Sequence, residues 1–365
     1  MKIVTVVGAR PQFIKAAVVS RAIAAHNQNN NQKLDEIIIH TGQHYDENMS
    51  KVFFHQLKIT KPDWLLNCGN MESHTKMLSK MLTGIEKVLL KCRPDGVLVY
   101  GDTNSTLAGA LAASQMRIPL FHVEAGLRSF NKLMSEERNR IVTDHLSSML
   151  FCPTLQSIVN LNKEGITEGI HFTGDVMYDA TLIFGATAEK KSRIIATLGL
   201  QAKKYRLCTV HRAENTDILN HLKQIVLALL EIATPDVPVI MPLHPRSKTF
   251  LEFFNLNKKI ATNSSIRLIN PCNYLDMAML EKNAATILTD SGGVQKEAYF
   301  YRTPCITLRD ETEWTETVTS GWNQLAGYRT EKILECLKTI PVTTEIDDYG
   351  DGHAAEKIVS VIAGR

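Results

Sequence analysis

Two parallel α/β domains in tandem are the fold that this sequence predicts. Short apolar runs rich in Val and Ile alternate with helical patterns along the chain, in two successive series. Continuous apolar strands separated by helices are typical of parallel sheets that are covered on both faces. The chain has 365 residues, which is too long for one ordinary core and suits two domains. We therefore expect two Rossmann-like domains, one after the other.

The first domain is expected over residues 1–173. Its predicted strands cover residues 2–7, 35–40, 95–100, 118–123 and 147–152. A helix is predicted from about Pro11 to Ala25, because an amphipathic pattern follows the first strand there. The polar residues 27–33 are expected to form the loop that leads into the next strand.

The second domain is expected over residues 174–352, with the linker near Gly174. Its predicted strands cover residues 205–210, 237–243, 265–270, 284–289 and 303–308. A final helix at about residues 353–365 is apolar on one face, so we expect it to pack back on the first domain.

Charge and cysteine content argue against several classes of function. Lys and Arg total 41 against 38 Asp and Glu, so nothing predicts a nucleic-acid partner. The seven cysteines contain no Cys-x-x-Cys pair, which argues against disulfides or a zinc ribbon and favours a reducing cytoplasm. No apolar run is long enough to cross a membrane, and the N-terminus has the pattern of a strand and not of a signal peptide. His40 and His44 lack a third ligand, so no metal is predicted.

Polar and charged residues follow nearly every predicted strand. Ligands of open α/β sheets bind beyond the carboxyl ends of the strands, so these segments are the candidates for a site. They cover residues 8–11, 41–44, 101–106 and 124–128 in the first half, and 211–215, 244–246, 290–293 and 309–311 in the second. A single polar segment of this kind is common in ordinary turns. The concentration of such segments at one edge of each sheet, however, predicts a binding site.

The stretch "LTDSGGVQKEAYF" leads from a predicted strand through Ser291, Gly292 and Gly293 into a helix. Glycines let backbone N–H groups approach a ligand, and a helix N-terminus attracts phosphate. Ser291 is placed to cap the helix or to donate to a phosphate oxygen, and Glu297, one turn further on, to accept from ribose hydroxyls. A Ser-capped tight turn explains the stretch equally well. No Gly-x-Gly-x-x-Gly or Walker motif occurs, so NAD and ATP are not expected.

The stretch "GARPQFIK" has the corresponding position in the first domain. Pro11 suits the first position of a helix. Arg10 stands at the end of the strand and Lys15 lies about one turn along the helix, and two cations there would suit a pyrophosphate. The alternative is that Lys15 is a solvated surface residue.

Asp102, Glu124 and His211 are the candidate proton-transfer residues at strand ends. Asp102 and Glu124 end neighbouring apolar strands, where a carboxylate faces the crevice and can have a shifted pKa. His211 ends the first strand of the second domain, and a His among carboxylates suits proton transfer. A lone His at a strand end is more often structural.

Glu136 and Glu137 follow Ser135, which is expected to cap the helix "EERNRIVTDHL". Glu136 is a further catalytic candidate. The alternative is that both acids only place negative charge at a helix N-terminus, with Glu136 and Arg140 as an ordinary i,i+4 pair. Glu137 is offset by roughly 100° on the helix, so we expect its removal to leave turnover nearly unchanged.

Taken together, these residues resemble the UDP-N-acetylglucosamine 2-epimerase family of the non-hydrolysing type. The stretches that carry the resemblance are "GARPQFIK", "HTGQH", "YGDTNSTLAGALAA", "HVEAGLRSFN", "EERNR", "GDVMYDA", "HRAEN", "PLHPR", "LTDSGGVQKEA" and "RDETEW". They extend from residue 8 to beyond residue 310, so the resemblance covers nearly the whole chain. The combination of "HVEAGLR" with "DSGG-Q-EA" is highly specific.

The resemblance implies a GT-B-like fold, with the active site in the cleft between the two Rossmann-like domains. The UDP-sugar-binding residues that it implies are Arg10, Lys15, Arg128, His244, Ser291, Gly292, Gly293 and Glu297. The implied acid–base residues are Asp102, Glu124, Glu136 and His211. It implies no cofactor and no metal, a UDP-sugar substrate, and a homodimer. Some members of the family have a UDP-N-acetylglucosamine activator site, which we do not assign.

The resemblance also implies a reaction, the inversion of C2 of a UDP-2-acetamido sugar. A base removes the C2 proton while UDP leaves C1, and UDP then adds back to the bound 2-acetamidoglycal with the proton returned to the opposite face. Ser135 and Trp314 stand where many members have Pro and Arg. The Trp form resembles a branch that acts on UDP-2,3-diacetamido-2,3-dideoxyglucuronic acid.

Three other functions fit parts of the pattern. A hydrolysing 2-epimerase would share the fold and the first step, but would release UDP and a free sugar. A GT-B glycosyltransferase would require an acceptor for turnover. A UDP-sugar-binding regulator would have no need for the acids and His211.

Overall fold

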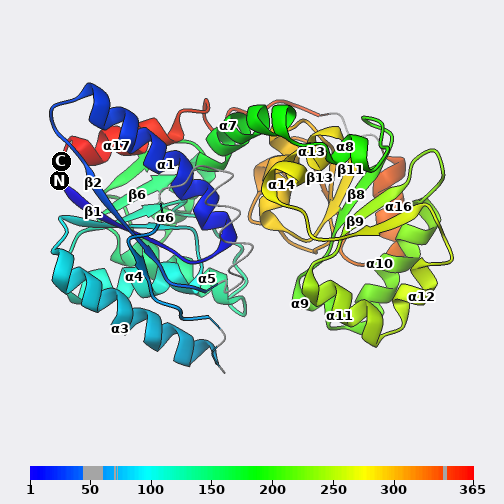
Figure 1. Ribbon diagram of the computed structural model, residues 1–365, viewed down its shortest axis with the longest axis horizontal. Helices are drawn as coiled ribbons and strands as arrows, with labels where there is room; N and C mark the ends of the chain where they lie inside the picture. The colour runs from blue at the N-terminus through cyan, green and yellow to red at the C-terminus, as the bar shows by residue number, and fades with distance from the viewer. Residues whose placement is uncertain (44–60, 70, 72, 340–342) are drawn as a thin grey trace. The chain divides into compact units, whose positions relative to one another are not determined.

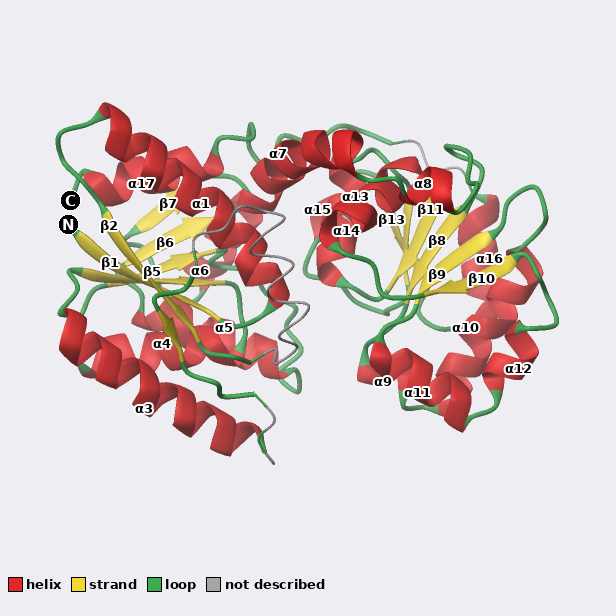
Figure 2. Ribbon diagram, viewed as in Figure 1, coloured by secondary structure: helices red, strands yellow, loops and turns green. Residues whose placement is uncertain are grey.

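The structure is a computed structural model that describes residues 1–43, 61–69, 71, 73–339 and 343–365 (Figure 1). These residues form two compact units: the first unit is Met1–Leu182 with Asp347–Arg365, and the second unit is Ile183–Ile346. Each unit is built around one parallel sheet, drawn in yellow in Figure 2. His44, which was set aside above as a metal ligand, lies outside the described residues.

The sheet of the first unit has seven described strands in the order β3-β2-β1-β4-β5-β6-β7. The strands are β1 (Lys2–Val7), β2 (Asp35–His40), β3 (Trp64–Leu65), β4 (Gly96–Tyr100), β5 (Leu120–Val123), β6 (Met149–Cys152) and β7 (Ile170–Phe172). All neighbours are parallel. The strands predicted from apolar runs are confirmed. The edge strands β3 and β7 were not predicted, because two and three residues are too few to give a periodic signal.

Helices cover both faces of this sheet. They are α1 (Arg10–Asn29), α3 (His74–Cys92), α4 (Asn104–Gln115), α5 (Ser135–Leu146), α6 (Leu155–Lys163) and α17 (Ala354–Ala363). Figure 1 shows α1 and α17 on one face and α3 and α4 on the other. Val6 and Val99 of the sheet are fully buried together with Met81 and Ile85 of α3, so the core lies between these layers.

Helix α1 is longer than predicted, since residues 27–29 continue it. The Asn27 side chain explains the difference. Its amide donates to the carbonyl of Leu34 and accepts from the N–H of Leu34, both at 2.8 Å. The polar side chain therefore ties down the following loop from within the helix and does not end the helix.

The first unit takes up more of the chain on both sides than the sequence suggested. The first division lies at residues 182/183 and not at 173/174, and the second lies at 346/347 and not at 352/353. The first turn of α7 (Val176–Lys191) is held to the C-terminal segment of the first unit. The carboxylate of Asp179 accepts from the N–H groups of Ala354 and Ala355, at 3.1 and 2.8 Å, where α17 begins. Helix α17 in turn packs against α1. These contacts make the start of α7 part of the first unit.

The sheet of the second unit has six described strands in the order β10-β9-β8-β11-β12-β13. The strands are β8 (Arg206–Thr209), β9 (Val239–Pro242), β10 (Ile266–Ile269), β11 (Thr286–Thr289), β12 (Cys305–Thr307) and β13 (Asn323–Leu325). All neighbours are again parallel. The short strand β13 was not predicted.

The helices of the second unit are α8 (Ile194–Thr197), α9 (Ala213–Thr216), α10 (Leu219–Ile232), α11 (Pro245–Phe253), α12 (Leu256–Ile260), α13 (Tyr274–Asn283), α14 (Gly292–Phe300), α15 (Thr315–Thr319) and α16 (Thr330–Lys338). A large core joins α10 and α16 to strands β8, β9, β11 and β12. Within the described part of the chain, none of the helices combines the length and the hydropathy that a membrane span needs.

Candidate active site

The turn between β1 and α1 is closed by the side chain of Gln12. The N–H groups of Gly8 and Ala9 donate to its carbonyl oxygen, at 2.8 and 3.0 Å. Its amide donates to the backbone oxygen of Tyr100 at 2.8 Å, so the turn is fixed to the end of β4. A Cβ on Gly8 would lie 2.0 Å from the Ser105 hydroxyl oxygen, which leaves no room for a side chain. Arg10, a predicted phosphate ligand, begins α1 directly after this rigid turn.

Lys15 and Glu124 form a buried ion pair, with the ammonium on the Oε2 atom of Glu124. Glu124 follows β5 and has a φ of +74°, the left-handed region that a residue with a side chain rarely adopts. Its N–H donates to the carbonyl of Phe151 at 3.0 Å, which helps to hold this backbone. Such strain is found at functional sites, where the surrounding structure over-determines it. Lys15 is thus not the solvated surface residue that was the alternative.

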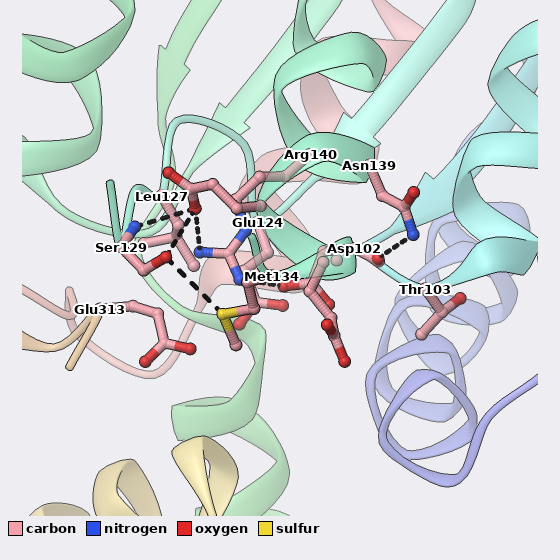
Figure 3. Close-up of polar contacts among 12 residues, drawn as sticks. Asp102, Thr103, Glu124, Leu127, Ser129, Met134, Asn139, Arg140 and Glu313 are labelled. Atoms are coloured by element: carbon pink, nitrogen blue, oxygen red, sulfur yellow. Dashed lines mark hydrogen bonds and ion pairs between the residues drawn. The ribbon is translucent and has the colours of Figure 1, made fainter. Parts of the chain in front are cut away.

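Asp102 follows β4, the neighbour of β5, and is held from helix α5. Arg140 donates from Nη2 to Oδ2 of Asp102 at 2.5 Å, and Asn139 donates to the Asp102 carbonyl at 2.9 Å. In Figure 3 both side chains extend from the helix toward the turn at Asp102. The Asp102 side chain is 30% exposed whereas Arg140 is 3% exposed. The carboxylate is therefore fixed by a buried cation and still accessible to a small molecule.

Glu136 and Glu137 have different surroundings in the first turn of α5. Glu136 is partly exposed and accepts from the Ser135 hydroxyl at 2.8 Å. Met134, and not Ser135, is the N-cap residue. Glu137 is 1% exposed and accepts from the N–H of Ser129 at 2.9 Å and the N–H of Phe130 at 2.8 Å. The preceding loop folds back onto Glu137, so this acid does more than place charge at a helix N-terminus. The expectation that its removal leaves turnover nearly unchanged rested on helical spacing alone and took no account of these contacts.

Arg128 lies in a buried ion-pair network. Its guanidinium donates to Glu164 at 2.6 and 2.7 Å and to Asp144 at 2.7 Å. Burial alone would lower the pKa of Arg128, but the hydrogen bonds and charges of Glu164 and Asp144 outweigh it and raise the pKa. The geometry thus gives Arg128 a part in holding the loop after β5.

His122 completes this network, and sequence reasoning missed it. One ring nitrogen lies 2.7 Å from Oδ1 of Asp144 and the other lies 2.7 Å from the carbonyl of Gly101. Burial alone would raise the pKa of Asp144, but His122 and Arg128 outweigh it and hold that pKa below its usual range. Asp144 lies in the last turn of α5, and nothing in the sequence distinguishes it from a surface acid.

In the second unit, His211 is paired with Asp290. The two follow the neighbouring strands β8 and β11, and His211 Nδ1 lies 3.1 Å from Oδ1 of Asp290. Asp290 also accepts from the N–H groups of His211 and Arg212 and from the Asn215 amide, at 3.0–3.1 Å. Burial alone would raise the pKa of Asp290, but these hydrogen bonds and the charge of His211 outweigh it and lower the pKa.

This pairing leaves one nitrogen of His211 for chemistry. The Asp290 carboxylate is fully buried and acts only as an acceptor, so it fixes a hydrogen on Nδ1. The His211 side chain is 35% exposed. The His244 ring lies 5.5 Å from the His211 ring, centroid to centroid, and His244 Nδ1 accepts from the N–H of Arg246 at the start of α11.

Ser291 is the N-cap residue of α14, and its hydroxyl accepts from the N–H of Val294 at 3.5 Å. The predicted cap is confirmed. A Cβ on Gly293 would meet no atom closer than the Ser291 hydroxyl oxygen at 3.9 Å, so the fold itself does not require glycine at this position. Glu297 is buried on the same helix. The burial of Tyr274, and after it the charge of Glu297, raise the pKa of Tyr274 well above the usual range.

Among the residues that the structure describes, no cluster of three or more His, Cys, Asp or Glu side chains is placed to hold a metal ion.

Comparison with known proteins identifies the relatives of this chain. A family model described as UDP-N-acetylglucosamine 2-epimerase matches residues 26–363. A UDP-N-acetylglucosamine 2-epimerase homolog of Methanococcus maripaludis is 52% identical over 365 residues, which cover 99% of each chain. The UDP-2,3-diacetamido-2,3-dideoxy-D-glucuronate 2-epimerase of Pseudomonas aeruginosa is 48% identical over 370 residues, covering 100% of this chain and 99% of the relative. A crystal structure of Methanocaldococcus jannaschii UDP-GlcNAc 2-epimerase in complex with UDP-GlcNAc and UDP is 45% identical and matches with a TM-score of 0.91, covering 100% of both chains.

Proposed function

The chain belongs to the UDP-N-acetylglucosamine 2-epimerase family and has its GT-B-like fold of two Rossmann-like domains, and we propose that it inverts C2 of a UDP-2-acetamido sugar while the sugar stays on UDP. The relatives from M. jannaschii and P. aeruginosa support this substrate class, since one was crystallised with UDP-GlcNAc and UDP and the other bears the name of a diacetamido glucuronate epimerase.

The observation that carries the proposal is a pair of anchored carboxylates at neighbouring strand ends. Asp102 after β4 is bonded to Arg140, and Glu124 after β5 is bonded to Lys15. The C2 proton of the intact sugar is not acidic, because no carbonyl is attached to C2. Elimination of UDP from C1 allows that proton to be removed, and inversion then requires a second group on the opposite face.

Asp102, Glu124 and Glu136 are the proposed acid–base residues of the first unit. Asp102 and Glu136 both keep exposed carboxylate surface, whereas Glu124 is nearly buried and strained in its backbone. Unequal surroundings are what two acid–base roles need, since one group must accept a proton while the other donates.

The second unit supplies the proposed UDP cradle. The N-terminus of α14, with Ser291, Gly292 and Gly293, offers N–H groups to the phosphates, and Glu297 would accept from the ribose. Arg10 and Lys15 would add positive charge toward the leaving pyrophosphate. His211, oriented by Asp290, would hold or move a proton at its Nε2 atom, with His244 beside it. No cofactor is needed for this chemistry.

A proton NMR assay of the purified protein tests the proposal. UDP-N-acetylglucosamine and its 2,3-diacetamido glucuronate analogue are supplied separately, without an acceptor. With the substrate that the protein accepts, the expected product is the manno epimer with UDP still attached. Free sugar with UDP would indicate the hydrolysing type. Absence of turnover with both substrates until an acceptor is added would indicate a glycosyltransferase.

We also propose that the protein works in the cytoplasm as a homodimer. Light scattering at assay concentration tests the dimer.

A further inference from the structure

Glu137 is the most completely buried acid of the α5 N-terminus, and the proposed mechanism does not use it. Its Oε1 atom accepts from the N–H of Phe130 at 2.8 Å. Its Oε2 atom accepts from the N–H of Ser129 at 2.9 Å and from the Ser129 hydroxyl at 3.0 Å. Phe130 has a φ of +61°, so this carboxylate holds a loop backbone that is unfavourable for a residue with a side chain.

Glu137 is also linked to the candidate acid Asp102. Its Oε2 atom lies 3.3 Å from Nη1 of Arg140, and Nη2 of the same guanidinium donates to Asp102 at 2.5 Å. One buried arginine therefore lies between a buried carboxylate and an accessible one. Figure 3 shows the Arg140 side chain between Ser129 on one side and Asp102 on the other. A guanidinium is planar and its donors have a fixed geometry, so its position sets the position of Asp102.

We propose that Glu137 is a positioning residue for the epimerisation: it orients Arg140, and through it Asp102, while it fixes the loop at Ser129 and Phe130 beside the site. This inference rests on the proposed function, because it needs Asp102 as an acid–base group. The loop that Glu137 holds carries two strongly exposed apolar side chains, Phe130 at 72% and Leu133 at 91%, which the first unit leaves in contact with solvent.

The variant Glu137→Gln tests the proposal with little change in shape. A glutamine can accept at only one of the two oxygen positions, so its amide hydrogens face either the Phe130 N–H or the guanidinium. Arg140 then loses the carboxylate charge on its Glu137 side, so the position of its guanidinium, and with it that of the Asp102 carboxylate, changes. We expect kcat to fall about 10–100-fold, because misplacing a reacting group by about 1 Å can cost on the order of 100-fold. KM should change little if the UDP cradle is intact.

The pH profile of kcat distinguishes positioning from a purely structural role. Removal of the Glu137 charge makes the electrostatic potential at Asp102 more positive, so the Asp102 carboxylate should stay deprotonated down to a lower pH. The acidic limb of the profile is therefore expected to move to lower pH in Glu137→Gln and to stay in place in Glu137→Asp. Three other titratable groups lie near this turn and are the same in both variants: Lys15 and Glu124 beside Gly101, and His122, whose ring lies 2.7 Å from the Gly101 carbonyl.

Asp179→Asn is the matched control. Asp179 is also a buried carboxylate of the first unit that accepts from two consecutive N–H groups, those of Ala354 and Ala355, but the described contacts do not link it to Arg140. We expect both variants to lower the melting temperature and only Glu137→Gln to lower kcat and shift the acidic limb. In an Asp102→Asn background, Glu137→Gln should add little further loss.

The outcomes separate the two claims. If Glu137→Gln melts earlier but keeps the wild-type kcat and acidic limb, as Asp179→Asn should, the positioning role is overturned and the proposed function stands. If Glu137→Gln does not fold, Glu137→Asp takes its place: its shorter carboxylate retracts from Arg140, so kcat should fall with the acidic limb in place, and a wild-type kcat in that folded variant overturns the positioning role. If the wild-type protein epimerises no UDP-2-acetamido sugar, the proposed function is overturned and this inference with it.

Discussion

Arg140, buried in helix α5, donates to the carboxylate of Asp102 at the end of strand β4 across 2.5 Å. The contact joins a helix to a strand end across 38 residues of sequence, and it leaves 30% of the Asp102 side chain exposed. An acid that is fixed by a cation and still accessible is suited to exchange a proton with a bound substrate. The functional account depends on this relationship and on its counterpart, the Lys15–Glu124 pair.

Removal of a single acid–base carboxylate is expected to stop the reaction without abolishing UDP binding. Asp102→Asn, Glu124→Gln and Glu136→Gln should each lower kcat by about 10²–10⁴-fold, which is the usual contribution of general acid–base catalysis. Steady-state kinetics with calorimetric titration of UDP measure both effects. The control is Glu86→Gln, an exposed acid of α3 in the same unit, which should keep the wild-type kcat. If Glu136→Gln behaves like that control, Glu136 only places charge at the start of α5.

The cradle at α14 predicts a loss of UDP affinity in Gly293→Val. A Cβ there would lie 3.9 Å from the Ser291 hydroxyl oxygen, which is an ordinary contact, so we expect the variant to fold. It would occupy the space that phosphates need beside the backbone N–H groups. Calorimetry is expected to show a weaker Kd for UDP at a nearly unchanged melting temperature. Wild-type affinity in the folded variant would mean that the Ser-Gly-Gly turn is only a helix cap.

The lowered pKa of Asp290 predicts how the thermal stability of the protein depends on pH. The pKa of this carboxylate is lowered in the folded protein, so it contributes stability above the unfolded value of about 3.9, and that stability is lost as the pH falls through the folded value. Asp290→Asn should therefore melt earlier than wild type at neutral pH, and the difference should shrink below about pH 4. Thermal melts from pH 7 to pH 3 measure this. A difference that does not depend on pH would contradict the ionised state of Asp290.

The same variant tests the orientation of His211. An amide can present its N–H₂ group to the ring and so favour the wrong tautomer, as replacing the orienting carboxylate does in catalytic triads. We expect kcat of Asp290→Asn to fall by at least about 100-fold. Conversely, a variant with wild-type kcat would show that His211 needs no carboxylate partner.

The strand ends could be predicted from the sequence because each long strand is a continuous apolar run bounded by polar residues. This pattern placed Asp102, Glu124 and His211 correctly at the carboxyl ends of β4, β5 and β8. The edge strands β3 and β7 have too few residues to give a pattern. The first domain boundary was placed too early, because no local signal shows that Asp179 accepts hydrogen bonds from the start of a helix 175 residues away.

The partners of the charged residues could not be predicted, because they come from distant parts of the chain. Arg128 was expected to face a ligand, yet its guanidinium donates to Asp144 in the last turn of α5 and to Glu164 after α6. Helical spacing separates Glu137 from Glu136 on α5, and the two acids do have different burial. It could not show that the loop at Ser129 folds back over Glu137, since a backbone with positive φ at Phe130 has no signature in sequence.

The most direct test of the central claim is the reaction in D₂O, followed by proton NMR on UDP-N-acetylglucosamine and on its diacetamido glucuronate analogue. The account predicts that the manno product forms with UDP still attached and with deuterium at C2, because a carboxylate that exchanges with solvent removes the proton and another group returns one. A manno product that keeps its C2 hydrogen throughout would contradict proton exchange through the accessible acids, and free sugar with UDP would contradict the re-addition of UDP.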